Sequence, residues 1–195
     1  MKLIIVRHGE TEENKIGIIQ GHLPGILSAL GIQQAKKIAL RLKDEKIDYI
    51  FSSDLKRASD TAKEIAIYHP NTPIQFVQDL RERYLGEYEG KQKSDFGFNS
   101  QDYTVAYIHI KNGESVEELY NRAERFLHTI ISQHPKDTVL CVGHNGINKA
   151  LIAVITGKKD IREIEDQKNT SINIFEIDEN KNHTIHALNC IKHLE

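Results

Sequence analysis

The chain has 195 residues, of which 39% are hydrophobic, so it can bury a sizeable core within a single domain spanning residues 1–195. Its 26 lysines and arginines are balanced by 28 aspartates and glutamates, which leaves a formal net charge of −2. Because this balance creates no general basic field, we expect neither nucleic acid nor an anionic membrane as a partner. No apolar stretch approaches the ~20 residues of a membrane span, and no signal-peptide pattern follows Lys2, which predicts a cytoplasmic protein.

The two cysteines, Cys141 and Cys190, both lie in apolar stretches. This placement predicts small buried side chains rather than a disulfide framework or a metal site. No pattern in the sequence predicts an oligomeric state.

Short apolar runs alternate with longer segments of helical period, which is typical of a mostly parallel sheet covered by helices. We therefore predict an α/β fold, a three-layer α/β/α sandwich. The predicted strands are Lys2 to Val6, Tyr49 to Ser52, Ile74 to Val77, Thr138 to Val142, Ile172 to Ile177 and Thr184 to Leu188, the last two as an antiparallel hairpin at one edge. The predicted helices begin at the capping residues Ser28, Asp54, Ser115 and Asn145, and run to about Lys43, Tyr68, Gln133 and Thr156.

The stretch from Lys91 to Gly113 has weak periodicity, mixed aromatic residues and several glycines or asparagines. It is predicted to form a short irregular lid or insertion, the kind of segment that often carries specificity. Possible substrate contacts within it are Lys93, Tyr103, Tyr107 and Lys111.

Arg7 and His8 directly follow the apolar run 3–6, where a buried strand reaches open space. In α/β proteins, ligands bind at such strand ends. A neutral imidazole can attack phosphorus, and an adjacent guanidinium can hold phosphate oxygens in a planar fork, so the pair indicates phosphoryl transfer. The alternative is a polar strand end with a chance histidine.

His144 follows a second apolar run, 139–142, and precedes a predicted helix that starts at Asn145. A helix that begins there would direct its free amides and its positive end at the same region, which favours bound phosphate. A structural histidine is the alternative for this motif taken alone.

Arg57 is predicted to lie in the first turn of the helix that follows the strand ending near Ser52. This position makes it a candidate for a second phosphate clamp. The spacing equally allows a surface ion pair with Asp54 or Asp60.

Together, these motifs resemble those of the histidine phosphatase superfamily, the group that includes cofactor-dependent phosphoglycerate mutases. The resemblance covers nearly the whole chain in ordered blocks. The matching residues are Arg7, His8, Gly9, Glu10, Thr11 and Asn14; Leu27, Ser28, Gly31, Gln34 and Ala35; Ser53, Asp54, Leu55, Arg57 and Ala58; Gly113, Glu114 and Ser115; and His144.

The resemblance implies roles for these residues. His8 would be the nucleophile that becomes phosphohistidine, and Glu82 the proton donor. Arg7, Arg57 and His144 would stabilise the transferred phosphoryl group. Further phosphate or substrate contacts are expected at Asn14, Gln20, Gly21 and Asn145.

Two of these assignments have local alternatives. Glu82 could be a surface acid that pairs with Arg81 or Arg83, and Asn14 and Gln20 could cap a helix or loop. The chemistry that the resemblance implies needs no metal and no cofactor, and it needs a small phosphorylated molecule as substrate.

Residues 80–90 favour the phosphatase-like branch of the family. Leu80-Arg81-Glu82 is followed at the family's spacing by Gly86 and by Glu89-Gly90, whereas mutases tend to have a histidine where this chain has Tyr84. Mutases also usually carry a longer insertion than 91–113. A mutase-type transfer and a phospholigand-binding module without turnover are the alternative functions.

The chain departs from the family pattern at three places. Pro24 and Ile26 replace an aspartate and a proline, and Asn145 stands where glycine is commoner. All three departures concern the rim of the predicted pocket.

Overall fold

The computed structural model describes residues 1–98, 110–180 and 182–195, which share one six-stranded sheet of order β3-β2-β4-β1-β5-β6. The first four strands in that order pair in parallel, while β5 is antiparallel to both β1 and β6. The strands are β1 Lys2–Arg7, β2 Tyr49–Ser53, β3 Ile74–Val77, β4 Thr138–Gly143, β5 Ile172–Ile177 and β6 His183–Cys190. The predicted edge hairpin is therefore confirmed as β5 and β6.

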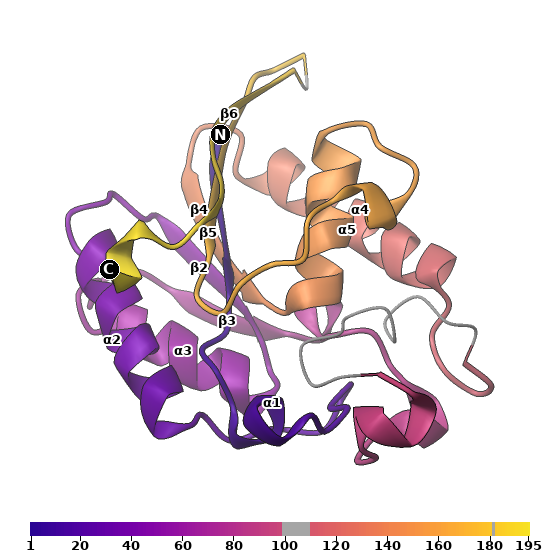
Figure 1. Cartoon of the computed structure of the whole chain (residues 1–195). Helices are drawn as coiled ribbons and strands as arrows, with labels where there is room; N and C mark the ends of the chain where they lie inside the picture. Colours follow the sequence, from indigo (N-terminus) through magenta and orange to yellow (C-terminus); the bar gives the residue numbers. More distant parts are fainter. Residues whose placement is uncertain (99–109, 181) are drawn as a thin grey trace.

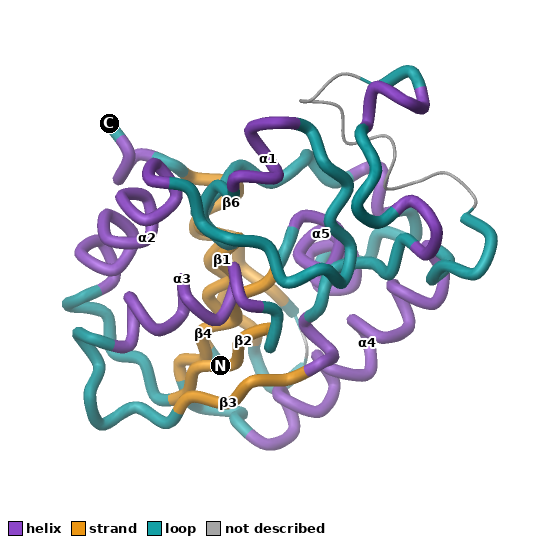
Figure 2. The backbone as a smooth tube through the Cα atoms, turned by 90° about the horizontal axis from the view of Figure 1, so that it is seen from below, coloured by secondary structure: helices purple, strands orange, loops and turns teal. Residues whose placement is uncertain are grey.

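Two layers of helix enclose the sheet, α2 and α3 on one face and α4 and α5 on the other (Figure 1). Seen along the sheet in Figure 2, the strands lie between these two pairs. The predicted three-layer α/β/α architecture is confirmed. The α-helices are α1 Glu12–Ile16, α2 Ala29–Leu42, α3 Lys56–Ala66, α4 Val116–Gln133 and α5 Asn145–Ile155, and the 3-10 helices are η1 Gln78–Leu80, η2 Gly86–Tyr88, η3 Lys93–Phe96, η5 Ile161–Glu163 and η6 Lys192–Leu194.

The central strands are apolar on both faces because helices cover both. Along β1, Leu3 and Ile5 pack with the α4 and α5 side, while Ile4 and Val6 pack with the α2 and α3 side. This alternation follows from the two-residue period of a strand. It explains why β1 is a continuous apolar run rather than an alternating pattern.

The capping residues predicted for two helices were wrong. The helix predicted to begin at Asp54 begins at Lys56, and its N-cap Leu55 makes no side-chain capping bond. Asp54 instead accepts two hydrogen bonds from Arg81, at 2.7 Å and 2.5 Å. The last helix has His144 rather than Asn145 at its N-cap.

Helix α1 was not predicted. It is a single turn closed by a reciprocal capping box in which Thr11 and Asn14 each bond the other's backbone N–H. Five residues are too few to give a periodic apolar signal.

Cys141 is buried in the core as predicted, but Cys190 on the edge strand β6 is only half-buried. Within the lid, Lys93 begins η3, whereas Tyr103 and Tyr107 lie outside the described residues. Over the three described ranges, no helix combines the length and apolar character needed to cross a bilayer.

Gly31 in the first turn of α2 lets this helix touch the chain that follows β1. A Cβ placed at Gly31 would lie 1.9 Å from the carbonyl oxygen of Glu10, and one at Gly9 would lie 2.5 Å from the Gly31 oxygen. The residues just beyond His8 are therefore pressed directly against the backbone of α2.

We expect Gly31→Ala to lower the free energy of unfolding by about 1–3 kcal/mol, the usual cost of overpacking. At an exposed helix position the same change raises the free energy of unfolding by roughly 0.5–1 kcal/mol. The sign of the measured change therefore shows whether steric contact or helix propensity dominates at Gly31. Urea unfolding measures the change, with the exposed neighbour Gln33→Ala as the matched control. A more stable Gly31→Ala protein would contradict the close approach.

Candidate active site

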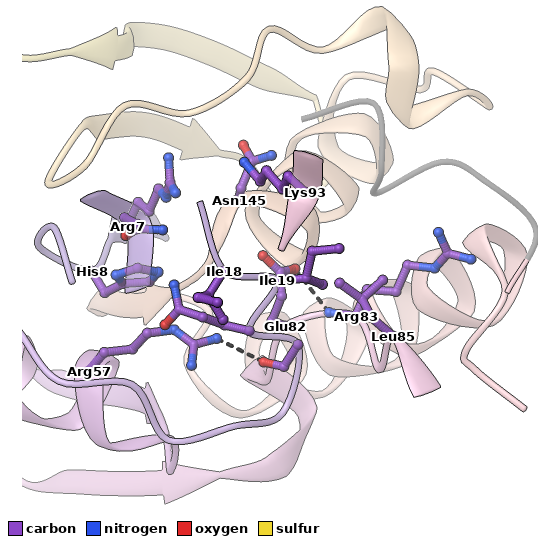
Figure 3. A pocket seen from close by; sticks show the side chains of 13 residues that line it. Arg7, His8, Ile18, Ile19, Arg57, Glu82, Arg83, Leu85, Lys93 and Asn145 are labelled. Carbon is purple, nitrogen blue, oxygen red and sulfur yellow. Dashed lines mark hydrogen bonds between the residues drawn. The ribbon is translucent and has the colours of Figure 1, made fainter. Parts of the chain in front are cut away.

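The predicted site residues meet because parallel strands end at one edge of the sheet. Arg7 is the last residue of β1 and pairs in register with Gly143, the last residue of β4. His8 and His144 therefore emerge side by side, with ring centroids 5.1 Å apart. Figure 3 shows Arg7, His8 and Arg57 facing the pocket from one side and Glu82 facing it from another.

The ring of His8 is fixed in one tautomer. Nδ1 lies 2.7 Å from the carbonyl oxygen of Gly9. Because a carbonyl only accepts, Nδ1 carries the hydrogen, and Nε2 of the neutral ring keeps its lone pair. The backbone of His8 is also held, since its N–H donates to the Gly143 oxygen at 3.0 Å and its oxygen accepts from Asn169 Nδ2 at 3.1 Å.

Both histidines are held neutral at ordinary pH. Burial lowers the pKa of His8 well below its usual value, and the cations Arg57 and Arg7 lower it further. Burial likewise lowers the pKa of His144, with added contributions from Arg57, His8 and Arg7. A neutral histidine is the form that can act as a nucleophile.

His144 is fully buried and bonded to the end of β2. Its Nε2 lies 2.9 Å from Ser53 Oγ. Its Nδ1 has no hydrogen-bond partner in the described part of the chain. Because buried polar atoms are usually satisfied, such an atom beside a pocket is a candidate ligand contact.

Arg57 is buried at the start of α3, and most of its donors go to main-chain carbonyls of the loop before α2. It donates to the oxygens of Gly21 at 2.8 Å, Pro24 at 3.3 Å, and Leu23. Its Nε has no partner among the described residues. Mainly because of burial, the pKa of Arg57 falls to about 10, so the side chain is still a cation at neutral pH.

The alternative surface ion pair of Arg57 is wrong. Asp54 pairs with Arg81, and Asp60 lies within ion-pair distance of Lys56 and Lys63. Arg57 is 1% exposed and turned away from both acids toward the loop 21–24.

The departures at Pro24 and Ile26 leave the rim intact because Arg57 recognises the loop through backbone oxygens. The Pro24 carbonyl accepts from both the backbone and the side chain of Arg57, which does not depend on the side chain at position 24. Ile26 contributes its backbone oxygen to Glu12 at 2.9 Å.

Arg7 is held by the chain that precedes β5. Its Nη1 donates to the carbonyl of Gln167. Asn145 secures that segment, because its Oδ1 accepts from Gln167 N at 2.8 Å and its Nδ2 donates to Asp166 at 3.1 Å. The predicted binding residue Asn145 lines the pocket, but the polar atoms of its amide hold the loop behind Arg7.

The carboxylate of Glu82 occupies the N-terminus of α5. It accepts from Gly146 N at 3.0 Å and 3.2 Å and from Arg83 N at 2.9 Å. An anion is stabilised at this end of a helix, so the amide that was expected to face phosphate holds a protein carboxylate instead. Glu82 lines the pocket, and the alternative pairing with Arg81 is wrong because Arg81 bonds Asp54.

The pocket has a cavity of about 70 Å³ and opens to solvent. Asn14 lines the pocket and its side chain accepts from Thr11 N in the capping box of α1, so the predicted capping is confirmed and the predicted phosphate contact stays a prediction. Gln20 and the neighbouring Gly21 line the pocket, and Gln20 Oε1 has no hydrogen-bond partner among the described residues.

Of the predicted lid contacts, Lys93 lines the pocket and Lys111 does not. The described residues that line the pocket are Arg7, His8, Asn14, Ile18, Ile19, Gln20, Gly21, Arg57, Glu82, Arg83, Leu85, Lys93 and Asn145.

Two supporting residues were missed from the sequence. Thr61 Oγ1 accepts from Gly9 N at 3.1 Å and donates to Arg57 O at 2.8 Å, which joins the two predicted phosphate motifs. His22 Nε2 donates to the Glu82 carbonyl at 2.8 Å. The spacing of Thr61, one helical turn after Arg57, was the available signal.

The low pKa values of the two buried histidines predict that stability falls in acid. In the unfolded chain a histidine has a pKa of about 6.5. Below that pH the unfolded state therefore binds protons that the folded state does not bind. Stability present above that pH is therefore lost as the pH falls. We expect each histidine to contribute about 1 kcal/mol of loss between about pH 7.5 and about pH 5.5.

Urea unfolding at the two pH values measures this loss. His144→Gln should lose about 1 kcal/mol less than the wild type. His128→Gln, at an exposed position of α4, is the matched control. Equal losses in the wild type and His144→Gln would exclude a buried neutral His144.

Comparisons with known proteins agree with this geometry. The histidine phosphatase superfamily (branch 1) matches residues 3–190. The chain is 34% identical to Phosphoglycerate mutase-like protein 4 of Arabidopsis thaliana, over 100% of this chain and 87% of that protein. It is 32% identical to the Metal-independent phosphoserine phosphatase of Arabidopsis thaliana, over 92% of this chain and 78% of that protein.

The crystal structure of a phosphoserine phosphatase from Entamoeba histolytica, in complex with 3-phosphoglyceric acid, matches with a TM-score of 0.84. It is 27% identical in sequence, and the match covers 100% of this chain and 99% of that one. The chain therefore belongs to branch 1 of the histidine phosphatase superfamily, as a hydrolase of the histidine phosphatase type.

Proposed function

We propose that this protein hydrolyses small phosphomonoesters through a phosphohistidine formed on Nε2 of His8. One observation carries the proposal: the neutral His8 lines a pocket together with two buried arginines and Glu82, and the ring centroid of a second neutral histidine, His144, lies 5.1 Å from that of His8. A module that only binds phosphate gains nothing from a neutral nucleophile facing a carboxyl group.

The first step forms a bond between His8 Nε2 and phosphorus and breaks the ester P–O bond. Glu82, as the carboxylic acid, gives its proton to the leaving oxygen. In the second step water attacks phosphorus, the P–N bond breaks, and the Glu82 carboxylate takes a proton from that water. His8 and Glu82 return to their starting forms, and inorganic phosphate leaves.

Charge spread over the phosphoryl oxygens is met by donors that are already fixed. Arg57 Nε and His144 Nδ1 are buried and have no partner among the described residues, so they can donate to these oxygens without first breaking a protein hydrogen bond. Arg7 adds a second guanidinium. Removing one preorganised donor of this kind typically costs about 3–4 kcal/mol of barrier.

The substrate class follows from the pocket and from the relatives. Beyond the two phosphate clamps, the pocket is lined by two more cationic side chains, Arg83 and Lys93. The names of two matched proteins specify phosphoserine phosphatases. We therefore propose phosphorylated metabolites that carry another polar or anionic group as substrates.

A mutase-type transfer is the second candidate, because one relative carries a mutase-like name. A mutase would return the phosphoryl group to a sugar acid and release little inorganic phosphate. Phosphate release from a panel that includes phosphoserine and 3-phosphoglycerate, followed in the presence of chelator, distinguishes the two. Release lost only in chelator would contradict a metal-independent reaction.

His8→Ala should abolish turnover and phosphoenzyme formation, because it removes the Nε2 atom proposed to form the P–N bond. The measurement is acid-quenched labelling with a ³²P-labelled substrate, together with phosphate release. His128→Ala, an exposed site on α4, is the matched control and should label normally. Near-normal turnover by His8→Ala would remove His8 from this role.

Glu82→Gln should lower kcat by roughly a hundredfold to ten-thousandfold while KM changes less than about threefold. The side-chain amide of the glutamine keeps an oxygen that can accept from Gly146 N, but it cannot give a proton to the leaving oxygen. Steady-state kinetics measures both constants, with the exposed Glu87→Gln as control. A rise in KM at constant kcat would show instead that Glu82 only binds substrate.

A further inference from the structure

Arg122 stands behind Glu82 without touching the pocket. It lies in the second turn of α4, and its side chain is 12% exposed. Helix α4 packs against η1, the 3-10 turn that leads into Leu80-Arg81-Glu82. Arg122 is not among the residues that line the pocket.

The guanidinium of Arg122 binds three carbonyls of the segment that carries Glu82. Nη1 donates to Asp79 O at 2.7 Å and to Arg81 O at 2.9 Å, and Nη2 donates to Glu82 O at 3.3 Å. This segment follows β3 and does not itself belong to a strand or an α-helix, so the usual backbone ladder does not fix it.

Glu114 holds the other side of the same guanidinium. Its carboxylate accepts from Arg122 Nε at 2.8 Å and from Nη2 at 2.7 Å, as a bidentate pair in which both side chains are largely buried. With the three carbonyls, all five N–H donors of Arg122 are used. Glu114 also accepts from Tyr84 N at 3.2 Å, so residues on both sides of Glu82 are held.

The Glu82 residue is consequently fixed at two points. Its carbonyl accepts from Arg122 and from His22, which uses both lone pairs, while its carboxylate is held by Gly146 N. The backbone carbonyl of Glu82 is thus bonded to α4, and its carboxylate is bonded to α5. Fixing a group within a fraction of an ångström strongly affects the rate of the step it takes part in.

We propose that Arg122, oriented by Glu114, is a positioning residue that aligns the Glu82 carboxyl group with the leaving oxygen of the substrate. The proposal rests on the proton-donor role of Glu82 given above. Arg122 reaches Glu82 through the backbone carbonyls of residues 79–82, and its charge makes a smaller contribution to the lowered pKa of His144. Its loss should disturb proton transfer while the phosphate clamps at Arg7 and Arg57 keep their contacts, and Arg122→Lys keeps the charge near His144.

The leaving group of the substrate separates positioning from general loss of structure. Phenyl phosphate has a poor leaving group that needs the proton, whereas 2,4-dinitrophenyl phosphate has a leaving group stable as an anion. Rapid mixing measures the first turnover of each, before hydrolysis of the phosphoenzyme limits the rate. We expect Arg122→Met to slow phenyl phosphate at least about tenfold and dinitrophenyl phosphate less than about threefold.

The matched control is Arg125→Met, which removes an exposed arginine from the same helix and should leave both rates unchanged. A double-mutant cycle tests the route of the effect. Adding Arg122→Met to Glu82→Gln should cost little further on phenyl phosphate, because the group being positioned is already gone. If Arg122→Met does not fold, Arg122→Lys keeps the charge but loses the five-donor fork, and the same comparison applies.

Each other outcome has a definite meaning. Equal slowing of both substrates, or no slowing of either, overturns the positioning role of Arg122. If Glu82→Gln itself shows no dependence on the leaving group, the proposed proton donor is wrong. A leaving-group effect in Glu82→Gln that is absent in Arg122→Met rejects the inference about Arg122 alone.

Discussion

Buried guanidinium groups shape the loops around this site. A buried cation is costly unless its donors are satisfied, and here main-chain carbonyls satisfy much of that need. Arg7 takes the carbonyl of Gln167, Arg57 takes those of the loop 21–24, and Arg122 takes those of residues 79–82. Each arginine thereby holds a different loop near the edge where the parallel strands end. The site is positioned by its cations as much as by its strands.

The same cations contribute to the chemistry of the histidines. Burial is the main reason that the pKa values of His8 and His144 are low, and Arg57 and Arg7 lower them further by disfavouring additional positive charge. Glu82, at the N-terminus of α5, is the one acidic residue among the described residues that line the pocket. The cations Arg7 and Arg57 favour binding of a phosphate dianion, and the separate position of Glu82 is consistent with the proton-donor role proposed for it.

The sequence allowed the architecture and the centre of the site to be predicted, because both depend on local order. Apolar runs marked the strands, and polar residues directly after them marked the edge where Arg7, His8 and His144 meet. The supporting contacts depend on distant segments and leave no local signal. Asp54 was predicted to cap a helix because the local sequence does not show its true partner, Arg81, which lies 27 positions away. The hydrogen bonds from Arg57 and Arg122 to main-chain carbonyls could not be predicted either, since any residue supplies a backbone oxygen.

Helix α5 has nine of its eleven residues buried. Such a helix opens only when the core itself opens, so its amides belong to the most slowly exchanging part of the molecule. The Gly146 amide that holds Glu82 and the His144 backbone at the start of the helix share that protection. We therefore expect this wall of the site to keep its geometry while less buried parts of the molecule open.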